Sequence, residues 1–267
     1  MRLSAIRSTK NPWAIAGLIF ATHYFQLYIL YKLPIFDLGL PGNWPVYVMR
    51  TISMAFSVLL VWWLAPDALR FFKFRFNQWK MYYLAAMIGA FVAAAFVNLV
   101  LYSIPVTEAF GALIFSMFIG FDEEFFDRVF VFGLLQRIGF EFALAASAVI
   151  FGAMHLTNFF YGDESLNYVL GHVVSAAGFG YLMAVTMVVS GNVWLPVLIH
   201  GLADLRWVSM DTTDYQKIVS GNTNWLSILI PVALTIFVSR VMLGLHQGRN
   251  LFPQSWNRPL RFLGLVE

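Results

Sequence analysis

Long apolar stretches, separated by short polar or Pro- and Gly-containing segments, recur along the whole chain. Eight apolar windows stand out: 13–32, 46–65, 81–102, 108–136, 141–160, 168–189, 193–210 and 224–244. An α-helix needs about 20 apolar residues to cross the hydrocarbon layer of a bilayer. The pattern therefore predicts an all-α polytopic membrane protein with about eight transmembrane helices. No internal repeat is recognisable, so we treat residues 1–267 as a single transmembrane domain.

Composition agrees with a membrane protein. The chain is 60% hydrophobic and 12% charged, whereas soluble domains carry about 25% charged residues. We therefore expect membrane lipids as partners. The absence of cysteine excludes disulfides, thiolate metal ligands and cysteine nucleophiles. The net charge of +3 is small, and nothing in the sequence indicates nucleic-acid binding.

The basic residues are unevenly divided between the segments that join the windows. Twelve of the 17 lie before the first window, after the second, after the fourth, or at or after the end of the eighth: Arg2, Arg7, Lys10, Arg70, Lys73, Arg75, Lys80, Arg137, Arg240, Arg249, Arg258 and Arg261. The alternate segments hold only Lys32, Arg50, Arg206 and Lys217. Cytoplasmic loops carry the excess of Lys and Arg, so both termini are expected in the cytoplasm. The membrane would be the plasma membrane in a bacterium or archaeon and the endoplasmic reticulum in a eukaryote.

Small residues are spaced by four in the window 168–189. They are Ala176, Gly180 and Ala184. Such spacing lets helix backbones approach closely in lipid, and we interpret it as a packing feature.

Window 108–136 departs from the apolar pattern because it contains Asp122, Glu123, Glu124, Asp127 and Arg128. A charge at the centre of a spanning helix costs about 2.5–3.5 kcal/mol on insertion scales. These side chains must therefore face the protein interior or a water-containing cavity. Glu124 and Arg128 are four residues apart, which favours an ion pair on one helix face. Glu123 lies about 100° further round the helix, so it can point elsewhere.

Two other windows carry polar residues at depth. His155 lies in the fifth window, and His200 and Asp204 lie one helical turn apart in the seventh. A single histidine in a span is often only a satisfied core residue, and we interpret His23 and His172 in that way. Carboxylates and imidazoles on three different spans indicate water activation instead. A glutamate can act as general base, and a histidine can donate to a developing oxyanion.

Three ordered segments resemble the motifs of the CAAX protease and bacteriocin-processing (CPBP) family, which includes the type II CAAX prenyl endopeptidases. They are Glu123-Glu124-x-x-x-Arg128, Phe151-x-x-x-His155 and His200-x-x-x-Asp204. The resemblance spans about 105–205 and implies an eight-helix glutamate intramembrane protease, with a motif-bearing core at about 105–210. It further implies a site without metal or cofactor, open toward the cytoplasmic half of the membrane.

The resemblance also implies roles for these residues. Glu123 would be the base that activates water, helped by His155. His200 and position 204 would form the oxyanion-stabilising side, and Arg128 would hold Glu124. Position 204 is Asp here, where the prenyl proteases usually have Asn. An ionised Asp cannot donate a hydrogen bond, so we expect it to orient His200.

The substrate would be a membrane-associated peptide or protein, prenylated or not: a Cys-a-a-X tail, a leader peptide or a C-terminal anchor. Three alternatives stay open. Glu123, His155, His200 and Asp204 could ligate zinc, although no His-Glu-x-x-His is present. Intramembrane carboxylates and histidines also serve proton-coupled transporters, although no inverted repeat is visible. A non-catalytic membrane scaffold is the third.

Overall fold

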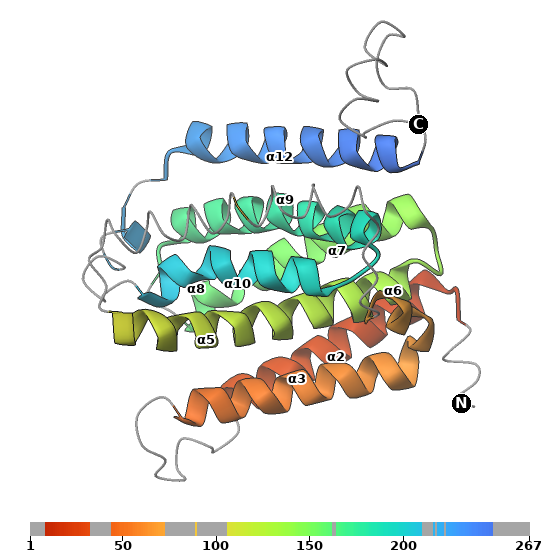
Figure 1. Ribbon diagram of the computed structural model, residues 1–267, viewed down its shortest axis with the longest axis horizontal. Coiled ribbons are helices and arrows are strands. Elements are labelled where there is room, and N and C mark those ends of the chain that lie inside the picture. The colour runs from red at the N-terminus through yellow and green to blue at the C-terminus, as the bar shows by residue number, and fades with distance from the viewer. Residues whose placement is uncertain are drawn as a thin grey trace, which may run out of the picture.

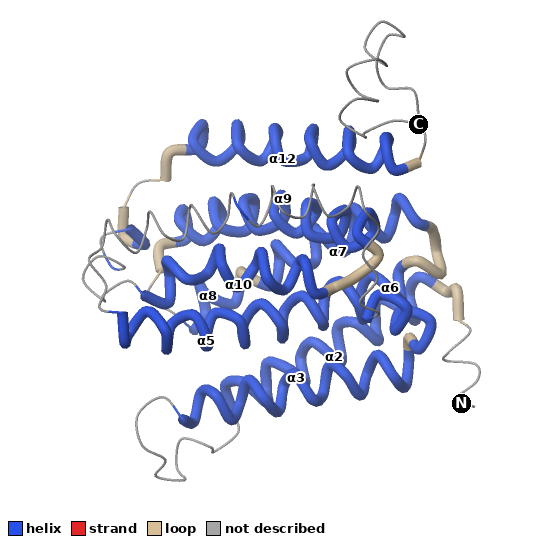
Figure 2. The backbone as a smooth tube through the Cα atoms, viewed as in Figure 1, coloured by secondary structure: helices blue, strands red, loops and turns tan. Residues whose placement is uncertain are grey.

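A computed structural model describes residues 9–32, 44–72, 89, 106–161, 164–209, 216, 218–221 and 223–247. Helices account for nearly all of this part of the chain, and no strand occurs in it (Figure 2). The elements are α2 (Pro12–Lys32), α3 (Trp44–Leu64), η2 (Pro66–Phe72), α5 (Val106–Glu124), η3 (Phe125–Val131), α6 (Phe132–Leu135), α7 (Phe140–Met154), α8 (Thr157–Tyr161), α9 (Leu166–Ser190), α10 (Trp194–Ser209) and α12 (Trp225–His246). The expected all-α class is confirmed.

Five of the expected windows coincide with single helices. The helices α2, α3, α9, α10 and α12 begin and end within two residues of windows 13–32, 46–65, 168–189, 193–210 and 224–244. The window 81–102 falls outside the described residues except for residue 89. Apolar length therefore located these spans well, because each is one helix bounded by polar, Pro or Gly residues.

The other two windows are not continuous α-helices. Window 108–136 consists of α5, the π-helical segment η3 and the short α6. Window 141–160 is interrupted by a turn at His155 and Leu156, between α7 and α8. Hydrophobic periodicity does not distinguish a short π segment from an α-helix. Such segments occur frequently at functional sites.

The helices pack as a bundle with roughly aligned axes (Figure 1). The extensive contacts are α5 with α10, α7 with α9, and α9 with α12. The helices α2 and α3 lie at one edge of the bundle and α12 at the opposite edge (Figure 1). Within the described residues, four helical segments are long and apolar enough to cross a membrane: Tyr47–Leu64, Phe140–Phe160, Leu166–Ser190 and Trp225–His246. Exposed apolar side chains such as Trp13, Phe20 and Phe237 suit contact with lipid. The chain is thus a polytopic integral membrane protein.

The two ends of the bundle can be defined by contacts between connecting segments. At the η2 end, Val193 donates its backbone N–H to Phe71, and Arg70 donates to Gln136. At the α8 end, Ser165 donates its backbone N–H to Val219. The helix α12 runs from the α8 end to the η2 end, and α2 begins at the η2 end (Figure 1).

Glycines bring the helices that carry the polar residues into close contact. A Cβ added to Gly120 of α5 would lie 2.7 Å from both Gly201 N and Val197 O of α10. A Cβ on Gly180 of α9 would lie 2.9 Å from the ring of Phe151. The expected packing role of Gly180 is therefore confirmed. The Gly120–Gly201 approach sets the distance between α5 and α10, and so between the residues that follow on each.

Candidate active site

A buried chain of polar contacts joins the first and third motifs. Arg128 Nε donates to Glu124 Oε2 at 2.9 Å, and His200 Nδ1 lies 2.8 Å from Glu124 Oε1. Arg128 and Glu124 are fully buried, and the guanidinium carbon of Arg128 also lies 4.5 Å from the centre of the Phe151 ring. Both oxygens of Glu124 are thus engaged. A carboxylate only accepts hydrogen bonds, so Nδ1 of His200 carries a proton and Nε2 faces away from Glu124.

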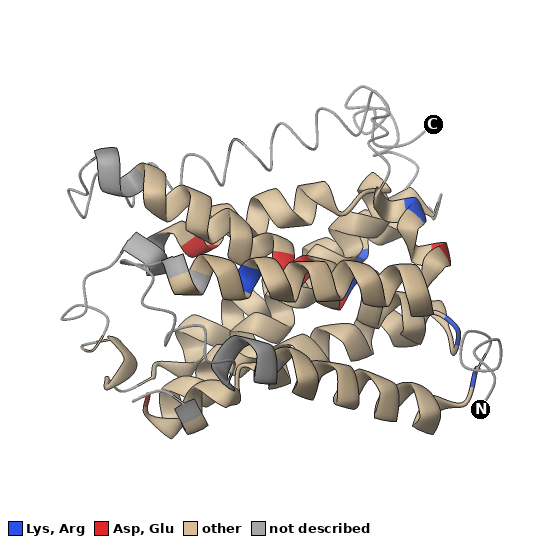
Figure 3. Ribbon diagram, turned by 90° about the horizontal axis from the view of Figure 1, so that it is seen from below, with Lys and Arg blue, Asp and Glu red and all other residues tan. Residues whose placement is uncertain are grey.

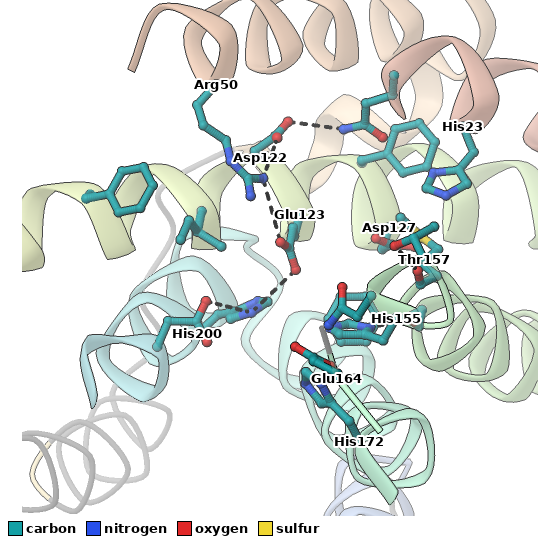
Figure 4. A pocket seen from close by; sticks show the side chains of 18 of the residues that line it. His23, Arg50, Asp122, Glu123, Asp127, His155, Thr157, Glu164, His172 and His200 are labelled. Atoms are coloured by element: carbon teal, nitrogen blue, oxygen red, sulfur yellow. Dashed lines mark hydrogen bonds and ion pairs between the residues drawn. The ribbon is translucent and has the colours of Figure 1, made fainter. Parts of the chain in front are cut away.

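Glu123 points in a different direction from Glu124, as its position on the helix predicted. Its carboxylate lies between two cationic or potentially cationic groups (Figure 4): Oε1 is 3.7 Å from Arg50 Nη1 and Oε2 is 3.7 Å from His200 Nε2. The Glu123 side chain keeps 23% of its surface exposed. At 3.7 Å neither contact has the length of a hydrogen bond, so each oxygen of Glu123 can still accept one. Both oxygens of Glu123 are therefore available to a water molecule.

Arg50 was assigned to a connecting segment by the charge count, and the structure places it within α3 as a neighbour of the site. Arg50 Nη1 lies 3.1 Å from Asp122 Oδ2. The other oxygen of Asp122 accepts a hydrogen bond from Ser53 at 2.7 Å and from Gln26 at 3.2 Å. These contacts fix Asp122 and Arg50 beside Glu123. The one signal in the sequence was an arginine within the apolar window 46–65.

His155 is held in one orientation by its own helix. The structure places its Nδ1 2.9 Å from the carbonyl oxygen of Phe151. Because a carbonyl oxygen only accepts, Nδ1 must be the protonated nitrogen. In the neutral ring, Nε2 is left as an acceptor. The ring of His155 lies edge-to-face against His172, with centroids 4.5 Å apart.

Asp204 lies on the cavity side of His200, where Oδ2 is 3.5 Å from Nε2. The sequence analysis expected Asp204 to orient His200. The role of Asp204 stays a prediction, and the structure adds a shorter contact of His200, from Nδ1 to Glu124 Oε1 at 2.8 Å. Asp204 approaches the nitrogen that faces the cavity, and its side chain is 24% exposed. It is therefore placed to contact a ligand next to His200.

One cavity of about 480 Å³ brings the four expected catalytic residues together. Glu123, His155, His200 and Asp204 all line it. Glu124 and Arg128 do not line it; they lie behind Glu123 and His200 and support them. The labelled side chains of Glu123, His155 and His200 converge on this space from three helical segments (Figure 4). A second cavity of about 340 Å³ also reaches His155, His200 and Asp204 and extends along α9 to Thr223 and Ile228.

The interpretation of His23 and His172 as satisfied core residues is wrong. Both line the larger cavity, and Nδ1 of each is buried without a hydrogen-bond partner among the described residues. The same holds for both carboxylate oxygens of Asp127, another lining residue. Buried polar atoms are nearly always hydrogen-bonded to protein or ordered water. These atoms therefore favour a water-containing cavity. An isolated histidine in an apolar window gives no signal that separates the two environments.

Zinc binding by Glu123, His155, His200 and Asp204 was one of the alternatives that the sequence left open. Among the described residues, no group of three or more His, Asp or Glu side chains is gathered closely enough to hold a metal ion. The carboxylates are divided instead between Arg50, Arg128 and His200.

Comparison with known proteins shows that the part of the chain that carries the site resembles a known family. Residues 105–206 match the family model described as type II CAAX prenyl endopeptidase Rce1-like. Searches of curated proteins and of solved structures found no match. The matched segment runs from the start of α5 into α10, and so includes every carboxylate and imidazole that the sequence analysis selected. On this match, the motif-bearing part of the chain, residues 105–206, is similar to the type II CAAX prenyl endopeptidase Rce1-like family.

Proposed function

We propose that this protein hydrolyses a peptide bond of a membrane-associated substrate by means of a water molecule that Glu123 activates. The family match supports a CAAX-type intramembrane protease. The proposal adds the catalytic residues and the course of the reaction. One observation carries it: Glu123 faces the cavity with neither oxygen closer than 3.7 Å to its cationic partners Arg50 and His200, whereas both oxygens of Glu124 are hydrogen-bonded.

The choice of Glu123 over its neighbours follows from their contacts. Glu124 is bound on both oxygens, and Asp122 is bound by Arg50, Ser53 and Gln26. A general base must reach the proton that it removes, directly or through one water. Asp122 and Glu123 both line the cavity, and Glu123 is the one of the two whose contacts, to Arg50 and His200, are longer than a hydrogen bond.

In the proposed reaction, a water molecule lies between Glu123 and Nε2 of His155. Glu123 takes one proton from the water while the oxygen attacks the carbonyl carbon of the scissile bond. The tetrahedral intermediate then collapses, the C–N bond breaks, and the proton passes from Glu123 to the leaving nitrogen. The products are a carboxylic acid and an amine, so water is the one co-reactant and no cofactor is required.

His200 would stabilise the oxyanion of that intermediate. Its Nδ1 is committed to Glu124, so donation to the oxyanion requires a second proton on Nε2. Three carboxylates lie within 3.7 Å of the ring nitrogens of His200 (Glu123, Glu124 and Asp204), and they would stabilise such an imidazolium. A hydrogen-bond donor that is fixed in a water-poor site stabilises a developing negative charge more strongly than the same donor in water.

The test is cleavage by the purified protein of a panel containing a farnesylated Cys-a-a-X peptide and unprenylated leader peptides. Glu123→Gln should abolish hydrolysis and leave the unfolding temperature within a few degrees of wild type. The matched control is Glu141→Gln, the same chemical change at a half-exposed pair with Arg240 on the surface, which should cleave at the wild-type rate. A chelator should leave the rate unchanged.

Cleavage by Glu123→Gln at the wild-type rate would refute the mechanism. Failure of the wild-type protein on every peptide, together with ion-dependent uptake into proteoliposomes that Glu123→Gln does not alter, would favour the transporter alternative. A partner-binding phenotype unaffected by Glu123→Gln would favour the scaffold.

A further inference from the structure

An arginine within an apolar helix lies beside the proposed base. Arg50 belongs to α3, a helix outside the segment 105–206 that matches the family model, so the three motifs assign it no role. Among the described residues, basic and acidic positions occur in the middle of the bundle as well as toward its ends (Figure 3). A charge within a spanning helix is costly unless it faces partners in the protein. The contacts of Arg50 therefore indicate what it does there.

One nitrogen of Arg50 approaches two carboxylates of α5. Nη1 lies 3.1 Å from Oδ2 of Asp122 and 3.7 Å from Oε1 of Glu123 (Figure 4). The first contact has the length of a hydrogen bond, and the second does not. Arg50 is therefore bound to Asp122 and acts on Glu123 as a nearby positive charge.

Asp122 has the contacts of an anchor rather than those of a base. Its side chain is fully buried, and Oδ1 accepts hydrogen bonds from Ser53 at 2.7 Å and from Gln26 at 3.2 Å. Gln26 also donates to Ser53 at 3.0 Å. Side chains of α2 and α3 thus fix Asp122, and Asp122 in turn holds the guanidinium group of Arg50 next to Glu123.

The cavity lining is rich in negative charge. Arg50 is the one Lys or Arg side chain among the described residues that line it, against five carboxylate side chains. The five are Asp122, Glu123, Asp127, Glu164 and Asp204. Neighbouring negative charges disfavour the ionised form of a carboxyl group, and a cation within about 4–6 Å favours it. A general base must be ionised to take a proton, so Glu123 requires a cation close by.

Glu123 lies between two groups that can supply this charge. Arg50 of α3 approaches one oxygen, and Nε2 of His200 in α10 lies 3.7 Å from the other. A histidine is charged only when both ring nitrogens carry a proton, whereas an arginine is always charged. The permanent positive charge beside Glu123 is therefore that of Arg50.

We infer that Arg50 is a positioning residue of the proposed reaction, which holds the carboxylate of Glu123 charged and turned toward the cavity, and that Asp122 acts by holding Arg50. The inference rests on the proposed function of Glu123. It makes α3, which the motifs do not include, a part of the site. Because Arg50 acts through Glu123 and not on the substrate, its removal should lower kcat and leave KM nearly unchanged.

The test separates the effect of Arg50 on Glu123 from its pairing with Asp122. Arg50→Met leaves the buried charge of Asp122 without its partner, so this variant should be less stable than wild type as well as slower. Arg50→Met combined with Asp122→Asn removes both charges. The double variant should recover stability, measured by thermal unfolding in detergent, but should not recover the rate.

The values of kcat and KM are measured with a peptide that the wild-type protein cleaves. General base catalysis contributes about 10²–10⁴-fold to a rate, and we expect both variants with Arg50→Met to lose about 10- to 100-fold in kcat, with KM within about threefold of wild type. Arg50→Lys keeps a positive charge and should retain at least about a third of the wild-type kcat. Arg70→Met is the matched control, because Arg70 is exposed on η2 and donates to Gln136; it should cleave at the wild-type rate.

Two results would overturn the inference. If the double variant regains the wild-type kcat together with its stability, Arg50 only compensates the charge of Asp122. If Arg50→Lys loses as much in kcat as Arg50→Met, the positive charge is not what Glu123 requires. Glu123→Gln is measured alongside: its cleavage at the wild-type rate would end the proposed function and this inference with it, whereas an inactive Glu123→Gln beside a fully active double variant would end the inference alone.

Discussion

The contact between Gly120 and Gly201 allows a test of how the site is assembled. Gly120→Ala places a methyl group 2.7 Å from two backbone atoms of α10, Gly201 N and Val197 O. Ordinary contacts of a Cβ atom begin at about 3.4 Å, so α5 and α10 must separate by about 0.7 Å (3.4 minus 2.7). Neither obstructing atom belongs to a flexible side chain, so no rotamer change relieves the overlap.

The change in the free energy of unfolding can be bounded from two opposing effects of the methyl group, overpacking and helix propensity. Overpacking of a close contact costs about 1–3 kcal/mol, occasionally more, and Ala gains up to about 1 kcal/mol over Gly in a helix. We therefore expect Gly120→Ala to destabilise the protein by about 1–2 kcal/mol. Because Glu123 and Glu124 follow Gly120 by one helical turn, the separation of α5 from α10 also moves both carboxylates away from His200. A misplacement near 1 Å can cost about 100-fold in rate, so we expect a 10- to 100-fold loss of cleavage.

Gly111→Ala is the matched control, because it lies on the same helix and a Cβ there meets nothing within 4 Å. Thermal unfolding in detergent and the rate of peptide cleavage are measured for both variants. Gly111→Ala should equal wild type in rate and match or exceed it in stability. If Gly120→Ala is indistinguishable from Gly111→Ala in both assays, the close approach does not hold the site together and the reasoning is refuted.

Three further predictions follow from the contacts of the site. Arg128→Met should lower stability by about 3–5 kcal/mol in chemical unfolding, because it leaves the buried charge of Glu124 without its partner. Adding Glu124→Gln should recover part of the loss, and no recovery would contradict the pairing. His155→Ala should reduce cleavage at least 100-fold with little change in unfolding temperature, and a rate within threefold of wild type would exclude a role in holding the water. Asp204→Asn should retain at least a tenth of the wild-type rate if Asp204 contacts the substrate as expected, because an amide can make the same contact, whereas complete loss would show that the charge itself is needed.

The sequence predicted the parts of the fold that depend on apolar length. The helices α2, α3, α9, α10 and α12 were located within two residues, because each is an uninterrupted apolar helix. The π-helical segment η3 and the turn at His155 were missed, since neither changes the apolar pattern. The count of eight spans, the cytoplasmic termini and the single domain stay predictions.

The site was predicted where its contacts are local in sequence. The Glu124–Arg128 pair and the separate direction of Glu123 follow from helical geometry and were confirmed. Contacts between helices were not predictable in the same way. Nothing in the spacing indicated that His200 would bind Glu124, or that Arg50 would lie beside Asp122 and Glu123. Those contacts depend on the packing of α5 against α10 and α3, which a single sequence does not reveal.

The most direct measurement of the central claim is the fate of the water oxygen in a single turnover. Enzyme in excess is mixed, in water enriched in ¹⁸O, with a peptide that the wild-type protein cleaves, and both product and enzyme are analysed by mass spectrometry. Activation of water by Glu123 predicts one ¹⁸O atom in the new carboxyl group of the product and none in the enzyme segment containing Glu123. Label in Glu123, with an unlabelled product, would mean that the carboxylate itself attacks the substrate and would contradict the account.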